Sequence, residues 1–542
     1  MVELINHGVY LLNGNEIRDN YQGMTPDEAR ENTITYGILR SHDVDGGKGN
    51  KMRIRFDAMM SHDITYVGII QTARASGLEE FPLPYAMTNC HNSLCAVGGT
   101  INEDDHVFGL SAAKKYGGIY VPANQAVIHQ YAREMMVKCG NMILGSDSHT
   151  RYGSLGNMGV GEGGGELVKQ LLKNTWDINA PEVVLVWLEG APKKGVGPHD
   201  VAISLVKATF ESGVVKNKVL EFAGPGVKNL PIDFRNGIDI MTTETTCLSS
   251  IWVTDDEVKH HYEIHERPQD YRELKPGDVA YYDMMIRIDL STQESMIALP
   301  FHPSNAVTIH ELQADPVGIL TRIEEDAKKR FGDKVDVHLV DKVVDGKVQA
   351  DQGIIAGCSG GTYDNLAEAA AILKGNNIGN DYFTASAYPQ STPVSMAVTR
   401  EGITADLIEA GVVMKPAFCG PCFGAGDVPS NNGLSIRHTT RNFPNREGSK
   451  PGQGQLSLVA LMDARSIAAT AANGGIITAA TDVEYENTHK PYVYDDKIYK
   501  CRVYNGFGKA RPETELRYGP NIKDWPKMYP MQENMLVELA AV

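Results

Sequence analysis

Apolar segments of strand length alternate with amphipathic segments of helix length along this chain, and this alternation restricts its fold more than any other feature. Residues 181–190, PEVVLVWLEG, precede a predicted helix over 197–213 that opens with Gly, Pro and Asp. The apolar run 353–358, GIIAGC, precedes a second predicted helix over 362–375. We expect Cys358 to end that strand, at the carboxyl edge of a sheet. The pattern predicts an α/β protein.

The chain is too long for a single hydrophobic core, since it has 542 residues, and we expect three or four domains. Passages rich in Gly, Pro or charge near 191–198, near 311–318 and after 474–482 are the predicted breaks. The last segment has many aromatic residues and no clear period, so we expect it either to wrap over the body or to lead into a further segment. The predicted units are three α/β domains and a C-terminal extension, 1–193, 194–315, 316–482 and 483–542.

The net charge of −17 argues against a general nucleic-acid binder, because affinity for phosphates needs a concentrated basic surface. It leaves anionic substrates open, since these respond to local arginines. No apolar run reaches the length of a membrane span, and the longest candidate, near 183–188, has the length of a strand. Glu3 and His7 stand where a signal peptide needs an unbroken apolar stretch. The sequence therefore predicts a cytoplasmic protein that binds neither nucleic acid nor membrane.

Three of the eight cysteines form a candidate metal site, since eight are too few for a disulfide scaffold. Cys419 and Cys422 form a C-x₂-C pair in a glycine-rich loop, and Cys358 lies in the earlier loop AGCSGG. Three thiolates and one open position suit a [4Fe–4S] cluster whose fourth iron is free to bind substrate. On spacing alone, a Cys₃His zinc site and three buried thiols stay open as alternatives.

Several histidines have acidic neighbours, an arrangement suited to proton transfer because a carboxylate fixes the tautomer of an imidazole and raises its basicity. The segment 145–151, GSDSHTR, carries Asp147 and His149. His91, His129 and Glu244 lie in the segments CHN, VIHQ and TTETT. One such histidine alone is more often structural, but several together favour a site.

Arg441 and Arg446 lie five residues apart in TTRNFPNREG, and planar guanidinium groups are the preferred partners of carboxylates. Singly, each is more typical of a surface ion pair. The glycine-rich segment 156–166 superficially resembles a dinucleotide loop, but no strand leads into it in the right register. It is predicted to be a tight turn followed by a helix start.

These segments occur in an order that resembles the aconitase superfamily, which includes aconitases, homoaconitases and the large subunit of isopropylmalate isomerase. The resemblance extends over most of the chain, from HDIT near residue 62 to RNFPNR at 441. It implies three α/β domains packed around a central [4Fe–4S] site. By this resemblance Cys358, Cys419 and Cys422 are the cluster ligands.

The resemblance also implies roles for the other residues. Acid–base catalysis is expected from five of them: His91, His129, Asp147, His149 and Glu244. Contacts with the substrate are expected from Arg441, Arg446, His62 and Ser148. The implied reaction dehydrates a small hydroxy-carboxylic acid and rehydrates the enoate, with the fourth iron as Lewis acid.

In single-chain aconitases the base that removes the carbon-bound proton is a serine on a fourth, swivelling domain. We find no such domain before Val542. Either a separate small subunit carrying the swivel domain completes the site, as in isopropylmalate isomerase, or the chain is a truncated or non-catalytic member of the family.

The sequence departs from the family pattern at positions that contact substrate, cluster or water in the relatives, namely His62, Cys90, Ile240, Ser359, Gly360, Gly361 and Thr440. Cys90 replaces an aspartate, which removes a carboxylate partner of His91 and is expected to weaken His91 as an acid–base group. Ile240 and Thr440 replace amides, which would leave a tricarboxylate short of hydrogen bonds at roughly 1–3 kcal/mol per unmet buried group. The predicted substrate is a hydroxy-acid other than citrate.

Two functions follow. The first is an aconitase-like hydro-lyase or isomerase that works with a swivel subunit. The second is a catalytically idle iron–sulfur protein that senses iron or redox state, because the departures gather at the acid–base and substrate positions while the thiols remain. A zinc hydrolase or a plain binding module is a third class, which bound zinc without acid-labile sulfide would indicate.

Overall fold

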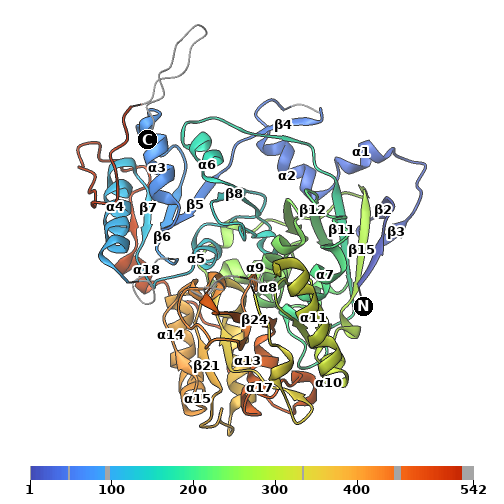
Figure 1. The fold of residues 1–542 in the computed structure, drawn as a ribbon. Helices are drawn as coiled ribbons and strands as arrows, with labels where there is room; N and C mark the ends of the chain where they lie inside the picture. Colours follow the sequence, from blue (N-terminus) through green and yellow to red (C-terminus); the bar gives the residue numbers. More distant parts are fainter. Residues whose placement is uncertain (1, 47–48, 92–97, 333–334, 445–452, 528–542) are drawn as a thin grey trace.

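The structure, a computed structural model, describes residues 2–46, 49–91, 98–332, 335–444 and 453–527. Three large sheets with helices packed against them fill these ranges, which confirms the predicted α/β class (Figure 1). Shorter elements flank them: α1 Pro26–Arg30, α2 Ile34–His42, β2 Val9–Leu12, β3 Glu16–Arg18, β4 Lys51–Ile54, β10 Trp176–Asn179, α9 Asp256–Ile264, β14 Val279–Tyr282, α10 Ile309–Ala314, α11 Pro316–Phe331, α14 Thr392–Arg400 and α15 Ile403–Glu409.

The first large sheet has the strand order β25-β7-β6-β5-β8-β9 and is drawn in blue to cyan in Figure 1, apart from the red strand β25. Five of its strands are parallel: β5 Ala58–His62, β6 Tyr85–Thr88, β7 Ile119–Val121, β8 Met142–Gly145 and β9 Met158–Gly161. Helices α3 Tyr66–Ala75, α4 Thr100–Tyr116 and α5 Ile128–Met135 are the crossovers between them, and α6 Gly164–Leu171 follows β9. Nearly all residues of these five strands are buried, as parallel strands covered on both faces require.

The second sheet, with the order β1-β15-β11-β12-β13, joins the N-terminal strand to later parts of the chain. Its strands are β1 Val2–Ile5, β15 Met284–Asp289, β11 Val183–Glu189, β12 Val219–Ala223 and β13 Ser249–Trp252. The strand predicted over 181–190 is β11, and the helix predicted after it is α7 Pro198–Thr209, so both are confirmed. This sheet takes strands from both sides of residue 193, and the domain boundaries stay a prediction.

The third sheet has the order β17-β16-β24-β23-β20-β21-β22 and lies at the bottom of Figure 1. Its strands are β16 Met296–Ala298, β17 Ala306–Thr308, β20 Gln352–Ile355, β21 Thr384–Ala387, β22 Val413–Met414, β23 Gly433–His438 and β24 Ser457–Met462. The helix predicted over 362–375 is α13 Tyr363–Leu373, which packs against α17 Ala464–Ala472. Strands β24, β23, β20, β21 and β22 are parallel, so their carboxyl ends share one edge.

Three local predictions are wrong. Cys358 does not end a strand: β20 ends at Ile355, and Cys358 lies in the single-turn helix α12 Gly357–Gly360. The segment of Cys419 and Cys422 is not a loop: Cys419 directly precedes a second short helix, α16 Gly420–Phe423, and Cys422 lies within it. The segment 156–166 contains the strand β9 before the helix start, because its backbone pairs with β8 despite its glycines.

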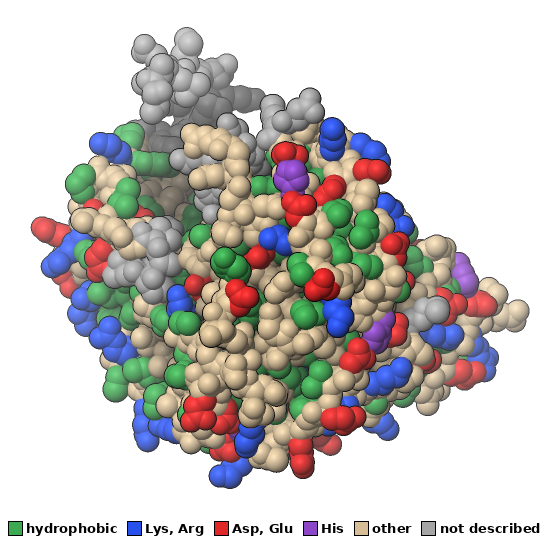
Figure 2. All heavy atoms as spheres, turned by 60° about the horizontal axis from the view of Figure 1, so that its bottom comes forward, with side chains coloured by type: hydrophobic (Ala, Val, Ile, Leu, Met, Phe, Trp, Pro, Cys, Tyr) green, Lys and Arg blue, Asp and Glu red, His purple; other side chains and the backbone are tan. Residues whose placement is uncertain are grey.

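The C-terminal segment first packs against helix α13, where Tyr485 and Asn487 bond to Glu368, and then reaches the first sheet. Helix α18 Lys497–Arg502 leads into β25 Tyr504–Asn505, which pairs antiparallel with β7. Among the described residues, no helix is both long and apolar enough to cross a bilayer. On the face drawn in Figure 2, basic side chains are interspersed with acidic ones, in keeping with the overall negative charge.

Candidate active site

The predicted site residues come together where the carboxyl edges of the first and third sheets meet. His62 ends β5, His91 follows β6 and Asp147 follows β8. Cys358 follows β20 and Arg441 follows β23 in the third sheet. Side chains that follow parallel strands gather at one edge of a sheet, which is where α/β proteins bind their ligands.

Asp147 is the centre of the histidine cluster. Its Oδ1 atom lies 3.1 Å from Nε2 of His129 and accepts a hydrogen bond of 2.7 Å from the backbone N–H of His149. Its Oδ2 atom lies 3.4 Å from Nε2 of His91 and 3.8 Å from Nε2 of His62. One carboxylate thus orients residues from four separate segments of the chain.

The charges in this cluster follow from burial and from these contacts. Burial acts to raise the pKa of Asp147, but the surrounding imidazoles outweigh it and hold that pKa well below its usual range. Burial lowers the pKa of His62 to about 3, and it also lowers the pKa of His129. At neutral pH an ionised Asp147 therefore faces a neutral His62 and a neutral His129.

A second chain of contacts runs from His149 towards the surface. His149 Nε2 lies 2.6 Å from Oε1 of Glu244, which lies in the 3₁₀ turn Thr242–Thr245 after helix α8 Ile232–Met241. Arg441 Nε donates to the same oxygen at 2.9 Å, and its Nη2 donates to Oγ of Ser148 at 3.0 Å. Burial opposes ionisation of Glu244, but His149 and Arg441 lower its pKa.

His91 has carboxylate partners even though position 90 is a cysteine. Its Nε2 faces Asp147, and its backbone N–H donates to Oδ1 of Asp63 at 2.8 Å. Asp63 is itself paired with His106 at 3.0 Å. Burial acts to lower the pKa of His91, but Cys90 and Asp147 together raise it well above its ordinary value. The fold supplies Asp147 from the end of β8, two strands away from β6 in the sheet, at a position that spacing along the sequence does not reveal.

The three predicted cluster thiols lie beside one another and beside the histidine cluster. Cys358 and Cys422 interact electrostatically with each other and with Asp147. Burial raises the pKa of Cys358 and of Cys422, and the adjacent Cys90 thiol raises that of Cys419. Thiols crowded in this way favour their ionised form only when a bound cation offsets the charge.

Two further features fit an iron–sulfur cluster at these thiols. A Cβ atom added at Gly357 would lie 2.5 Å from Sγ of Cys422, so the glycine keeps space beside that thiol. Ser359 Oγ is buried next to Cys358 and has no hydrogen-bond partner among the described residues, which leaves it available to a bound group. Arg133 Nη1 also donates to the carbonyl of Cys358 at 3.1 Å and holds the turn in place.

Cys90 was predicted only as a substitution that weakens the site, and its proximity to the cluster thiols was missed. Its Sγ atom lies 3.3 Å from Nδ1 of His91, and its thiol is hydrogen-bonded to that of Cys419. Burial acts to raise the pKa of Cys90, but Cys419 and His91 lower it to about 6. A cysteine directly before a site histidine was the available sequence signal.

The remaining predicted positions are distributed as follows. Arg446 lies outside the described residues. Ile240 is fully buried in α8, and Thr440 hydrogen-bonds to Cys422. Thr440 thus contacts a predicted cluster ligand.

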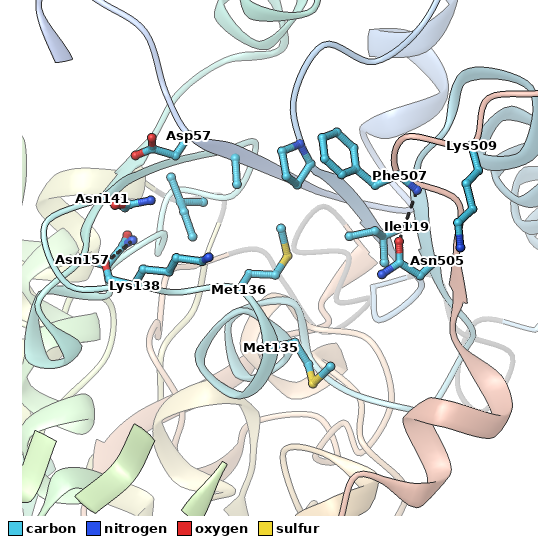
Figure 3. A pocket seen from close by; sticks show the side chains of 13 residues that line it. Asp57, Ile119, Met135, Met136, Lys138, Asn141, Asn157, Asn505, Phe507 and Lys509 are labelled. Atoms are coloured by element: carbon cyan, nitrogen blue, oxygen red, sulfur yellow. Dashed lines mark hydrogen bonds between the residues drawn. The ribbon is translucent and has the colours of Figure 1, made fainter. Parts of the chain in front are cut away.

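A separate hollow of about 560 Å³ opens at the opposite, amino-terminal edge of the first sheet (Figure 3). Asp57, Met136 and Asn141 are among the residues that line it, and Phe507 and Lys509 come from the C-terminal segment. None of the predicted site residues lines this hollow. It is therefore distinct from the histidine and cysteine site.

The described residues define an α/β protein with a histidine–carboxylate cluster beside three buried or half-buried thiols. The chain belongs to the aconitase family: the family profile, described as aconitate hydratase, matches residues 36–469. The predicted resemblance is thereby confirmed.

Curated relatives carry related names. The 3-isopropylmalate dehydratase large subunit of Elusimicrobium minutum is 27% identical over 343 residues, which are 63% of this chain and 73% of the relative. The mitochondrial aconitate hydratase of Schizosaccharomyces pombe is 26% identical over 471 residues, 81% of this chain and 56% of the relative. The chain thus spans little more than half of that aconitate hydratase.

Among solved structures, aconitase X of Thermococcus kodakaraensis in its holo-form aligns with 78% of this chain and 94% of its own, with a TM-score of 0.38 and 11% identity.

Proposed function

We propose that this protein is a hydro-lyase that removes water from a small hydroxy-carboxylic acid and returns it to the enoate. The observation that carries the proposal is the contact of Asp147 with histidines from separate segments, directly beside Cys358 and Cys422. The hydratase and dehydratase names of the relatives support the same reaction class.

The thiols of Cys358, Cys419 and Cys422 would hold a [4Fe–4S] cluster, and the fit of Gly357 and Ser359 around them supports this assignment. When bound, such a cluster supplies a Lewis-acidic iron at its unligated corner.

Proton transfer to the departing hydroxyl is assigned to His91. Its raised pKa keeps it protonated near neutrality, and Asp147 holds its Nε2 atom at 3.4 Å. A protonated imidazole fixed by a carboxylate is a suitable general acid. When the enoate is rehydrated, the deprotonated His91 accepts the proton back from water. His129, neutral and held by the same carboxylate, is proposed to support this exchange by keeping Asp147 in place.

Substrate recognition is assigned to Arg441, with Ser148 beside it. The guanidinium is held by Glu244 and Ser148, and about a quarter of the side chain, 23%, is exposed. An oriented guanidinium of this kind is a good partner for a substrate carboxylate. Arg446 and His62 are proposed as further contacts.

The proposed substrate is a hydroxy-acid other than citrate. Ile240 offers no hydrogen bond from its side chain, and Thr440 is engaged with Cys422, so both positions contribute little to a third carboxylate. Because several relatives are named large subunits, we also propose that a smaller subunit completes the site with the base for the carbon-bound proton.

The test is anaerobic purification with iron and sulfide, followed by an assay of a panel of hydroxy-acids with and without a candidate small subunit. Formation of the enoate is followed by its ultraviolet absorbance. We expect turnover of at least one acid, and a loss of about 10²–10⁴-fold in the Asp147→Asn variant, the usual contribution of general acid–base catalysis. A loaded cluster with no turnover of any candidate would contradict the proposal and favour an idle iron–sulfur protein.

A further inference from the structure

Cys90, His91 and Cys419 form a compact group whose ligand atoms, two thiols and one imidazole nitrogen, lie within 4.8 Å of one another. All three residues are buried. Only Cys419 belongs to the predicted cluster ligands, so the group is a second arrangement that overlaps the first at one residue.

The spacing within this group matches the ligands of a single ion. Two thiolates on one tetrahedral zinc ion lie roughly 3.5–4 Å apart, given zinc–sulfur bonds of about 2.3 Å. The Cys90 Sγ and His91 Nδ1 atoms are 3.3 Å apart, and the Cys90 thiol is hydrogen-bonded to that of Cys419. In a cluster, by contrast, each cysteine binds an iron of its own, so two thiols in contact are better suited to one shared ion.

The surroundings hold this group in place. The backbone N–H of Cys419 donates to the carbonyl of Cys90 at 2.9 Å, which ties together two segments far apart in the sequence. The His91 ring stacks with His62, at a centroid distance of 3.8 Å, and with Phe423, at 5.1 Å. Asp63 fixes the His91 backbone.

The two nitrogens of His91 have different partners. Its Nδ1 atom faces Cys90, while its Nε2 atom lies 3.4 Å from Asp147. A histidine that binds a metal through one nitrogen commonly bonds a carboxylate through the other, which fixes the tautomer and strengthens the ligand.

We propose that Cys90, His91 and Cys419 bind a single divalent cation of the zinc class in the cluster-free protein. Soft sulfur ligands and one imidazole suit Zn²⁺, and two thiolates balance its charge. Because Cys419 serves both arrangements, a bound ion and the cluster exclude each other. This exclusion rests on the proposed function, whereas the ion site itself does not.

The first test uses Co²⁺ as a probe of the reduced, cluster-free protein, since thiolate-bound tetrahedral cobalt has distinct charge-transfer and visible absorption. We expect one ion per chain. Cys90→Ala should weaken binding more than about 100-fold, and Asp147→Asn about 10–100-fold, the usual effect of removing an outer partner. Cys90→Ser retains the side-chain size and is the second variant should the alanine variant misfold.

Two variants serve as matched controls. Cys139→Ala removes a buried thiol outside the group and should leave cobalt binding unchanged. Cys358→Ala removes a predicted cluster ligand that is not part of the group, and it should also bind cobalt like the parent protein. Unchanged binding in both Cys90 variants, or an equal loss in Cys358→Ala, would overturn the ion site.

The second test addresses exclusion. The protein is saturated with Zn²⁺ before reconstitution with iron and sulfide, and acid-labile sulfide is measured. We expect zinc to reduce sulfide uptake at least tenfold in the parent protein and less than twofold in Cys90→Ala. Equal uptake with and without zinc would overturn the exclusion, whereas no uptake even without zinc would overturn both the exclusion and the proposed cluster.

Discussion

Asp147 sets the charge state of the candidate site at the scale of single residues. Its side chain is 14% exposed, and histidines from four segments lie around it. Because its pKa is held well below the usual range, it remains ionised across the physiological range and gives the imidazoles a fixed negative partner. Glu244 does the same for His149 and Arg441.

Glu244→Gln should weaken both the fold and the site. The substitution removes the charge that faces His149 and Arg441, and charged hydrogen bonds contribute roughly 1.5–3 kcal/mol each. The free energy of unfolding at neutral pH should fall by an amount in that range, measured by chemical denaturation. The depressed pKa of Glu244 stabilises the fold above about pH 4.5, and this contribution is lost as the pH falls through the folded-state pKa.

The glutamine variant should therefore show a shallower loss of stability in acid than the parent protein. Equal stability of the two proteins at pH 7 would contradict the role of Glu244 as a buried ionised partner.

Contacts between residues close together in the sequence could be predicted at this scale, whereas contacts between distant segments could not. Asp147 and His149 were paired correctly because they are two residues apart. The contact of His149 with Glu244 joins positions 95 residues apart, and no periodicity reveals it. The sequence prediction for Cys90 considered only the aspartate that it replaces. The contact between its thiol and that of Cys419 depends on the fold, which brings the two residues together.

Single-turn helices at strand ends position the thiols at the scale of elements. Strand β20 ends at Ile355, and the chain turns at Gly357, whose φ of +73° is in the left-handed region, to enter α12. Such a turn favours glycine because a side chain there is strained. Here the missing side chain also leaves space for Cys422.

Gly357→Ala should lower the cluster content of the protein strongly and its free energy of unfolding only modestly. An alanine with positive φ costs roughly 1–2 kcal/mol, and its Cβ would also lie 2.5 Å from Sγ of Cys422. Gly375→Ala is the matched control, since Gly375 has a φ of +79° but nothing within 4 Å of an added Cβ. Both variants should lose similar stability, and only Gly357→Ala should lose sulfide. Full cluster content in Gly357→Ala would contradict the claim that a Cβ atom at this position disturbs the Cys422 thiol.

The longer elements were predictable and the shortest were not. Strand β11 is a continuous apolar run and helix α13 is a segment of helix length, and both were predicted near their observed bounds. Helices α12 and α16 have four residues each, too few for a helical period to appear in the sequence. Their glycines predicted loops instead.

At the scale of the whole molecule, a buried polar cluster joins the first sheet, the third sheet and the C-terminal segment. Glu134 in α5 accepts hydrogen bonds from Gln130, from Ser391 at the start of α14 and from Tyr499 in α18. Burial raises the pKa of Glu134 to about 7. These bonds connect parts of the chain that sequence reasoning assigned to different domains.

The raised pKa of Glu134 predicts that stability falls as the pH rises from about 4.5 to about 7, since the folded state then binds more protons than the unfolded state. The change should be roughly 2–3 kcal/mol, because one pKa unit corresponds to about 1.4 kcal/mol. Glu134→Gln keeps the shape of the side chain and should remove this part of the pH dependence. Denaturation curves across this range give the comparison, and identical pH profiles would contradict the prediction.

The most direct test of the central claim is the acid-labile sulfide content of the anaerobically reconstituted protein, compared with that of Cys422→Ser. A cluster held by Cys358, Cys419 and Cys422 predicts close to four sulfides per chain in the parent protein and almost none in the variant. Absence of sulfide from the parent protein, or a fully loaded Cys422→Ser variant, would contradict it.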